Sequence, residues 1–178
     1  ENIATLRSLG CEVEVFPCDV VDQEALSAVA GEISGRLGSV ALLLHGAGLE
    51  ESKFLHDKDM VGFQRVFDPK ASAALTLWFS LRPERMVTMG SVAGRFGNGA
   101  QVDYAAANEL MGALSRSEKR NILNINWTAW GDVGMATRGS VQQVLESTGV
   151  DLLPAATGAA LGASLAASGC SGDVVVAG

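Results

Sequence analysis

The chain has 178 residues, of which 48% are hydrophobic, so it is long enough for one domain with a sizeable core. Its formal net charge of −7 argues against a binder of nucleic-acid backbones, because no basic stripe is available. No apolar run approaches the ~18 residues that span a bilayer, so we expect no membrane partner.

Three cysteines form no Cys-x-x-Cys pair and no metal-ligand cluster, so we predict no metal site. Their odd number, without a secretory leader, favours a reducing, cytoplasmic location. The chain begins with Glu1 rather than Met, which suggests a domain cut from a larger protein.

Apolar runs alternate with helical patterns along the chain. The first predicted strand, Val13 to Phe16, ends at Pro17, and a helix is predicted from Asp22 to Leu37. Val40 to Leu44 is a continuous apolar run, as in a parallel strand buried on both faces. A long helix is predicted over Met60 to Leu81.

The second half of the chain continues this alternation. The predicted strands are 86–89, 122–127 and 173–176, and the predicted helices are 101–117, 141–146 and 155–167. Such alternation indicates an α/β fold in which right-handed βαβ units build a doubly wound parallel sheet, the Rossmann type.

One expected unit is absent from this pattern. A dinucleotide-binding domain should open with a strand, a glycine-rich turn and a helix that holds the pyrophosphate. Nothing before Cys11 can form it, and the glycines of 94–99 follow a later strand, so we interpret them as a loop near the substrate. We therefore expect the first βαβ unit to be missing from the chain, and residues 13–16 not to pair with 40–44.

The only tyrosine, Tyr104, precedes Asn108 by four residues, which places both on one helix face. Ser91 ends the preceding strand and can lie beside that helix. A hydroxyl that polarises a carbonyl oxygen and a phenol of lowered pKa that protonates it would together reduce a ketone.

The sequence resembles the ketoreductase domains of polyketide and polyunsaturated-fatty-acid synthases, in the short-chain dehydrogenase/reductase superfamily. The resemblance rests on three segments and covers nearly the whole chain: Gly90-Ser91-Val92-Ala93-Gly94, Gln101 to Asn108, and Ile125 to Trp130. Most superfamily members have Tyr-x-x-x-Lys, whereas synthase ketoreductases have Tyr-x-x-x-Asn and take the lysine from an earlier helix, where this chain has Lys70. The sequences of residues 45–52 and 94–98 most resemble those of enediyne and polyunsaturated-fatty-acid synthases.

The resemblance implies four catalytic residues. Ser91 would polarise the substrate carbonyl, Tyr104 would protonate it, and Lys70 would lower the pKa of the phenol and join the proton relay. Asn108 would orient the relay. Read without the family, Lys70 could be a solvated lysine and Asn108 a helix-surface amide.

The resemblance also implies a set of NADPH-binding residues. Besides Tyr104 and Lys70, the set comprises Asp19, Val20, His45, Gly46, Ala47, Gly48, Trp127 and Thr128. Asp19 could instead cap the helix that starts near Asp22. His45 is more simply structural, and Trp127 and Trp130 could equally be core aromatics.

The resemblance thus predicts that residues 1–178 are an N-terminally incomplete ketoreductase domain. It would use NADPH to reduce a 3-oxoacyl thioester, presented by an acyl carrier protein, to the 3-hydroxyacyl product beside other synthase domains. The alternative is a nonreducing structural domain of the same fold. Leu49-Glu50-Glu51-Ser52 lies where some ketoreductases carry Leu-Asp-Asp, so the hydroxyl configuration stays open.

Overall fold

Four parallel strands form the centre of the computed structural model, which describes residues 2–117, 121–131, 133–134 and 151–177. They are β1 (Leu42–His45), β2 (Arg85–Ser91), β3 (Ile122–Trp127) and β4 (Gly172–Val176), in the spatial order β1-β2-β3-β4. This sheet confirms the predicted α/β fold. The helix predicted over 141–146 lies outside the described residues.

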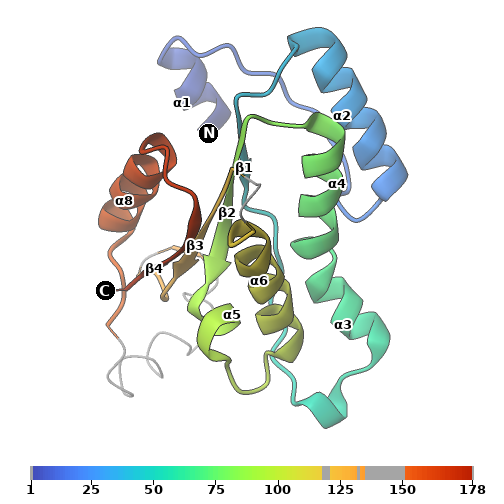
Figure 1. Cartoon of the computed structure of the whole chain (residues 1–178), viewed down its shortest axis with the longest axis vertical. Coiled ribbons are helices and arrows are strands. Elements are labelled where there is room, and N and C mark those ends of the chain that lie inside the picture. Colours follow the sequence, from blue (N-terminus) through green and yellow to red (C-terminus); the bar gives the residue numbers. More distant parts are fainter. Residues whose placement is uncertain (1, 118–120, 132, 135–150, 178) are drawn as a thin grey trace.

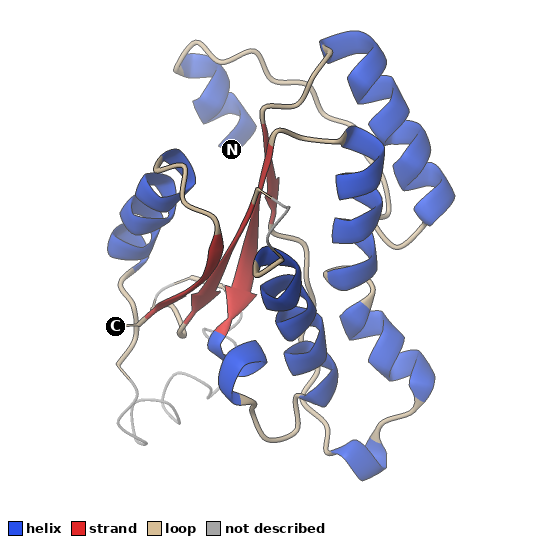
Figure 2. Cartoon of the chain, in the orientation of Figure 1, coloured by secondary structure: helices blue, strands red, loops and turns tan. Residues whose placement is uncertain are grey.

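Helices cover both faces of the sheet (Figures 1 and 2). The helices α2 (Gln23–Leu37), α4 (Ala71–Leu81) and α6 (Val102–Ser115) lie on one side, with α3 (Met60–Phe67) below α4, and α8 (Ala155–Ala167) lies on the other side. The short elements are α1 (Asn2–Ser8), η1 (Leu55–Asp57) and α5 (Val92–Phe96). Within the described part of the chain, no helix is long and apolar enough to cross a membrane.

The core consists of two apolar clusters, one on each face of the sheet. On the α4–α6 face the cluster contains Ala71, Ala74, Met86, Ala107, Met111 and Ile122. On the α8 face it contains Val87, Leu123, Ile125, Trp127 and Leu153. Successive residues of β2 and β3 point to opposite faces, and these two central strands are buried on both sides of the sheet.

The predicted strand Val13 to Phe16 is wrong, because these residues adopt no strand conformation. Glu14 instead pairs with Arg36 of α2 at 2.6 Å, and Val15 is 56% exposed. A strand needs a neighbour for its backbone groups, and within the described residues β1 pairs only with β2. As expected, no ladder of hydrogen bonds joins residues 13–16 to β1.

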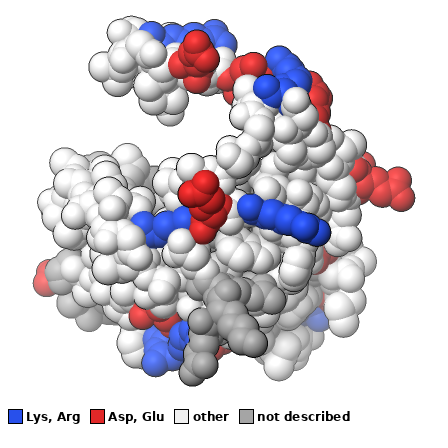
Figure 3. Space-filling model, turned by 45° about the horizontal axis from the view of Figure 1, so that its top comes forward, with Lys and Arg blue, Asp and Glu red and all other residues white. Residues whose placement is uncertain are grey.

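The prediction that the 40–44 run is buried on both faces is also wrong. β1 is an edge strand, and Leu42 and Leu44 are 40% and 55% exposed. The N-terminal arm, including α1, projects over a hollow whose visible surface is mostly uncharged (Figure 3).

Two further boundaries differ from prediction. The long helix over 60–81 is interrupted at Asp68–Lys70, because Pro69 has no amide hydrogen and its ring cannot pack against the preceding helical turn. Of the loop predicted over 94–99, residues 94–96 instead belong to α5, and the Ser91 side chain caps this helix by accepting from the Ala93 amide at 3.2 Å. Asp22 caps α2 in the same way, by accepting from the Ala25 amide at 3.0 Å.

Candidate active site

The predicted catalytic residues meet at the carboxyl end of β2. Ser91 is the last residue of β2, and Tyr104 lies in the first turn of α6, which packs closely against α5 and the sheet. In a parallel sheet the loops that leave the carboxyl ends of the strands form the ligand crevice. The fold therefore places both hydroxyl groups where such a crevice is expected.

The phenol of Tyr104 is half-buried, and its pKa is raised above the ordinary value of 10.0. Burial is the largest cause, and the negative charge of Glu50 adds to it, whereas hydrogen bonding from Ser91 and Asn108 lowers the pKa. The expected lowering of this pKa by Lys70 is therefore wrong for the protein alone. At neutral pH the phenol holds its proton and can donate it.

Lys70 occupies the turn before α4, and only 4% of its surface is exposed. Its Nζ donates to the Met89 carbonyl oxygen at 2.6 Å, two residues before Ser91, so the amine lies at the same end of β2 as the phenol. Burial lowers its pKa from 10.5 to about 8. Gly48 makes room for it, since a Cβ there would lie 3.0 Å from the lysine Cε.

Asn108 is fully buried one helical turn after Tyr104. Its Nδ2 donates to the Tyr104 carbonyl oxygen at 2.8 Å, while its Oδ1 has no hydrogen-bond partner among the described residues. Gly94 of α5 packs against it so closely that a Cβ would lie 2.7 Å from the asparagine Cβ. The interpretation of Asn108 as a surface amide is thus wrong.

His45 ends β1 and is 3% exposed. Its Nε2 hydrogen-bonds the Lys70 carbonyl oxygen at 2.9 Å, and burial, with the nearby Lys70 charge, lowers its pKa to about 4. The neutral ring therefore donates this bond at physiological pH and holds the turn that carries Lys70. The geometry agrees with the structural interpretation of this histidine.

An open hollow of about 610 Å³ lies between the segment after residue 18 and the turn after β1. Four predicted cofactor-binding residues line it: Asp19, Val20, Ala47 and Gly48. Asp22, not Asp19, caps α2, and the Asp19 carboxylate only closes a local turn by accepting from the Val21 amide at 3.1 Å. Gly46, the residue directly after β1, lies close to Met89 of β2, because a Cβ on Gly46 would be 3.9 Å from the Met89 Cγ.

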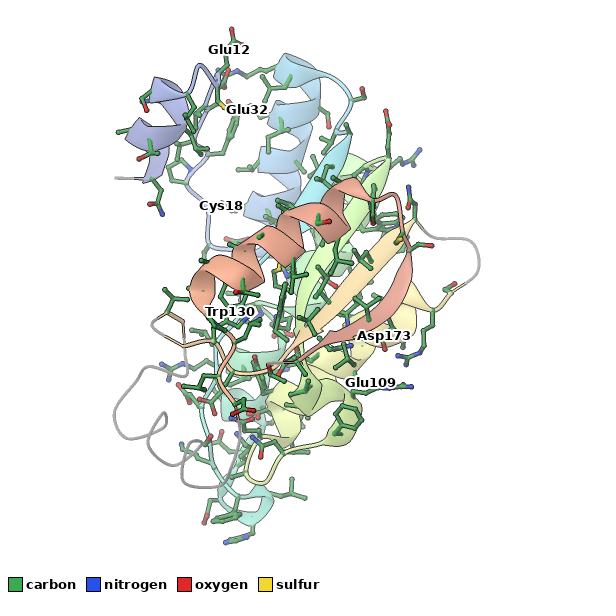
Figure 4. The ribbon with its side chains drawn as sticks, turned by 90° about the vertical axis from the view of Figure 1, so that its left-hand side faces the viewer. Glu12, Cys18, Glu32, Glu109, Trp130 and Asp173 are labelled. Carbon is green, nitrogen blue, oxygen red and sulfur yellow. The ribbon has the colours of Figure 1, made fainter. Side chains whose placement is uncertain are left out.

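Trp127 and Trp130 pack edge to face beneath α8, with ring centroids 5.0 Å apart, and Trp130 is labelled in Figure 4. Gly158 and Gly162 of α8 leave space for the two rings. Trp127 is 8% exposed, which favours its role in the core over contact with a cofactor. The Thr128 amide donates to the Val176 carbonyl oxygen at 3.0 Å, while its buried hydroxyl has no partner among the described residues.

Two polar clusters were not predicted. One lies beside β3, where Asn124 and Asn126 both donate to Asp173 of β4, and Arg116 links Asp173 to Glu109 of α6 (Figure 4). The other joins Lys58 to Asp103, the residue before Tyr104. The sequence signals were only polar residues within apolar elements, without any indication of their partners. Across the described residues, no group of three or more His, Cys, Asp or Glu could hold a metal ion.

The chain is similar in sequence to known proteins. The model of the KR domain family matches residues 1–132. The chain is 36% identical over 140 residues to erythronolide synthase EryA3 of Saccharopolyspora erythraea, and 28% identical over 192 residues to polyketide synthase PksM of Bacillus subtilis. These alignments cover 75% and 100% of the chain but only 4% of either relative.

Solved structures are similar over a larger share of their length. A ketoreductase domain from the bacillaene assembly line has a TM-score of 0.76 and 31% identity, covering 89% of this chain and 41% of that one. PlmKR1, the ketoreductase from the first module of phoslactomycin biosynthesis in Streptomyces sp. HK803, has a TM-score of 0.86 and 26% identity, covering 98% and 42%.

Proposed function

Because the chain belongs to the KR domain family, the ketoreductases of polyketide synthases, we propose that it reduces a 3-oxoacyl thioester to the 3-hydroxyacyl product with NADPH. The observation that carries this proposal is the placement of the Tyr104 phenol beside Ser91 at the carboxyl end of β2. A proton donor and a polarising hydroxyl at one ligand edge suit carbonyl reduction.

The residues present fit part of a dinucleotide, since the unit that would hold the pyrophosphate is not among them. Asp19, Val20, Ala47 and Gly48 line one hollow and would hold the nucleotide portion. The buried Asn108 Oδ1 and Thr128 hydroxyl are polar groups that a bound ligand or water could satisfy. NADPH supplies the hydride when it is bound; the choice of NADPH over NADH follows from the family alone.

In this mechanism Ser91 donates a hydrogen bond to the substrate carbonyl oxygen and orients it against Tyr104. The carbonyl carbon gains a hydride while the oxygen gains the phenol proton, so a ketone becomes an alcohol. The Lys70 amine, with a pKa of about 8, can release and regain a proton near neutral pH, which suits returning one to the phenolate. Asn108 would hold this first turn of α6 in place.

The partners belong to the same proposal. The matched relatives are synthases of which the chain covers a small part, so we expect other synthase domains and an acyl carrier protein that presents the thioester, in the cytoplasm. The nonreducing alternative has less support, since Ser91, Tyr104, Lys70 and Asn108 are all present at one strand end.

Tyr104→Phe tests the proposal, because it removes only the proton donor. Oxidation of NADPH in the presence of a 3-oxoacyl thioester should slow by about 10²–10⁴-fold. Ser91→Ala should also slow it, whereas Ser80→Ala, at an exposed position of α4, should not. Circular dichroism would check that each variant is folded, and near-full turnover by Tyr104→Phe would refute the assignment.

A further inference from the structure

A fully enclosed ion pair lies directly beside the proposed proton donor. Lys58 Nζ and Asp103 Oδ2 are 2.5 Å apart, and their side chains are only 4% and 0% exposed. Asp103 lies in the first turn of α6, and Lys58 follows η1, next to α3, which also packs on α6 (Figure 1). The two residues are forty-five positions apart, so the fold brings them together.

The second oxygen of Asp103 acts on Tyr104 itself. Asp103 Oδ1 accepts from the Tyr104 backbone amide at 2.9 Å. Gln101, the residue at the N-cap of α6, makes no side-chain capping bond. The first four amides of a helix have no partner within the helix, so Asp103 satisfies one that the cap leaves free, and its charge suits the helix N-terminus.

The same ammonium also holds the segment Glu50–Lys53. Lys58 Nζ donates to the Glu51 carbonyl oxygen at 2.8 Å. The Lys53 amide donates to the Ala100 carbonyl oxygen at 2.8 Å, and Gln101 Nε2 donates to Glu50 Oε1 at 2.8 Å. Glu50 in turn acts on the phenol through its charge.

Backbone strain marks the same junction. Ala100 adopts a φ of +62°, a left-handed conformation that favours glycine, immediately before α6. Such strain persists where the surroundings over-determine the backbone, and it clusters at functional sites. The junction between the Glu50–Lys53 segment and α6 is thus held at several points.

We propose that Lys58 and Asp103 are positioning residues of the proposed reductase, which fix Tyr104 and the Glu50–Lys53 segment relative to each other. A buried ion pair stabilises a fold no better than a well-packed apolar pair does, so stability alone does not account for it. Its distinctive property is geometric: one cation joins a loop to the turn that carries the phenol. This inference rests on the proposed function.

A double-mutant cycle tests it in the full chain, with the melting temperature and kcat measured for each variant. Lys58→Met and Asp103→Leu together should restore a melting temperature that either single change lowers. Yet kcat should stay about 10²-fold below wild type, the size of effect that a small misplacement of reacting groups produces. Lys58→Gln with Asp103→Asn keeps a hydrogen-bonded pair and should retain kcat within a few-fold.

A readout independent of catalysis comes from the sole tyrosine. The phenol pKa is obtained from the difference between the ultraviolet titrations of the protein and of its Tyr104→Phe variant. In the double variant Lys58→Met with Asp103→Leu, this raised pKa should fall toward the ordinary value. Arg36→Met, which removes the exposed ion pairs of α2 with Glu32 and Glu14, is the control and should change neither kcat nor the phenol titration.

The inference would be overturned if the double variant Lys58→Met with Asp103→Leu folds and has the same kcat and the same phenol pKa as the wild type. If that variant does not fold, the double variant Lys58→Gln with Asp103→Asn provides the test. A kcat no higher than that of Lys58→Gln alone would equally overturn the inference. A wild-type chain without reductase activity would refute the proposed function instead, and the phenol titration would still report on positioning.

Discussion

Lys70→Met should make the protein more stable at neutral pH, because the lysine amine is buried and has no carboxylate partner among the described residues. Its pKa falls from 10.5 to about 8 on folding. At ~1.4 kcal/mol per pH unit this difference corresponds to roughly 3 kcal/mol of unfavourable free energy when the amine is charged in both states. Removing the amine also loses its bond to the Met89 carbonyl oxygen, worth about 1 kcal/mol.

The net gain in the free energy of unfolding is therefore about 2 kcal/mol at pH 7. For a chain of this length that is roughly 4–8 °C in the melting temperature. Between pH 8 and 10.5 the unfolded chain binds more protons at Lys70 than the folded chain, so wild-type stability rises with pH across this window. The advantage of Lys70→Met should thus shrink by about 2 kcal/mol from pH 7 to pH 9.5.

Denaturant unfolding at the two pH values, monitored by circular dichroism, is the measurement. Lys53→Met, at an exposed site, should change nothing, and Lys58→Met should destabilise by about 3–5 kcal/mol because it leaves Asp103 charged and unpaired. A Lys70→Met variant that is less stable than wild type at pH 7, or whose advantage does not depend on pH, would refute the reasoning.

Three further outcomes follow from the site and its packing. Glu50→Gln should lower the pKa of Tyr104 in an ultraviolet titration, since the carboxylate raises it; an unchanged or higher value would contradict this. His45, with its pKa lowered to about 4, should make stability fall by roughly 3 kcal/mol between pH 6.5 and 4, where the unfolded chain binds more protons, and His45→Gln should remove that slope. Gly94→Ala should destabilise by about 1–3 kcal/mol, because its Cβ would lie 2.8 Å from the α6 backbone, whereas Gly31→Ala has open space in α2 and should stabilise slightly; equal melting temperatures would argue against such close packing.

The elements that were predicted correctly carry their own evidence in the sequence. β3 and α8 match their predicted bounds, Ile122–Trp127 and Ala155–Ala167, because the pattern of apolar residues in each element is a local property of the sequence. The run at 13–16 looked equally apolar, but it is not a strand because it has no neighbour to pair with. The break at Pro69 was visible in the sequence and was outweighed by the helical pattern on both sides of it.

The candidate site was predicted on a different basis. Ser91, Tyr104, Lys70 and Asn108 were named from a family pattern, and the fold brings them to the carboxyl end of β2. Their electrostatics was not predictable from spacing. The expected lowering of the phenol pKa by Lys70 required the lysine charge to act on the phenol more strongly than burial does, whereas burial is the largest cause of the pKa shift in both groups.

The charges of the two buried lysines therefore differ in their effect on the stability of the fold. Lys58 has a carboxylate partner at 2.5 Å, and removing either member would leave a charge stranded in the interior. Within the described part of the chain Lys70 Nζ has only a carbonyl oxygen as partner, so its charge opposes folding, and the fold retains it at a cost in stability. Residues that stability does not favour cluster where a protein binds and reacts. The unfavourable burial of the Lys70 charge thus points to the carboxyl end of β2 as the candidate reaction centre. This argument does not depend on Tyr104.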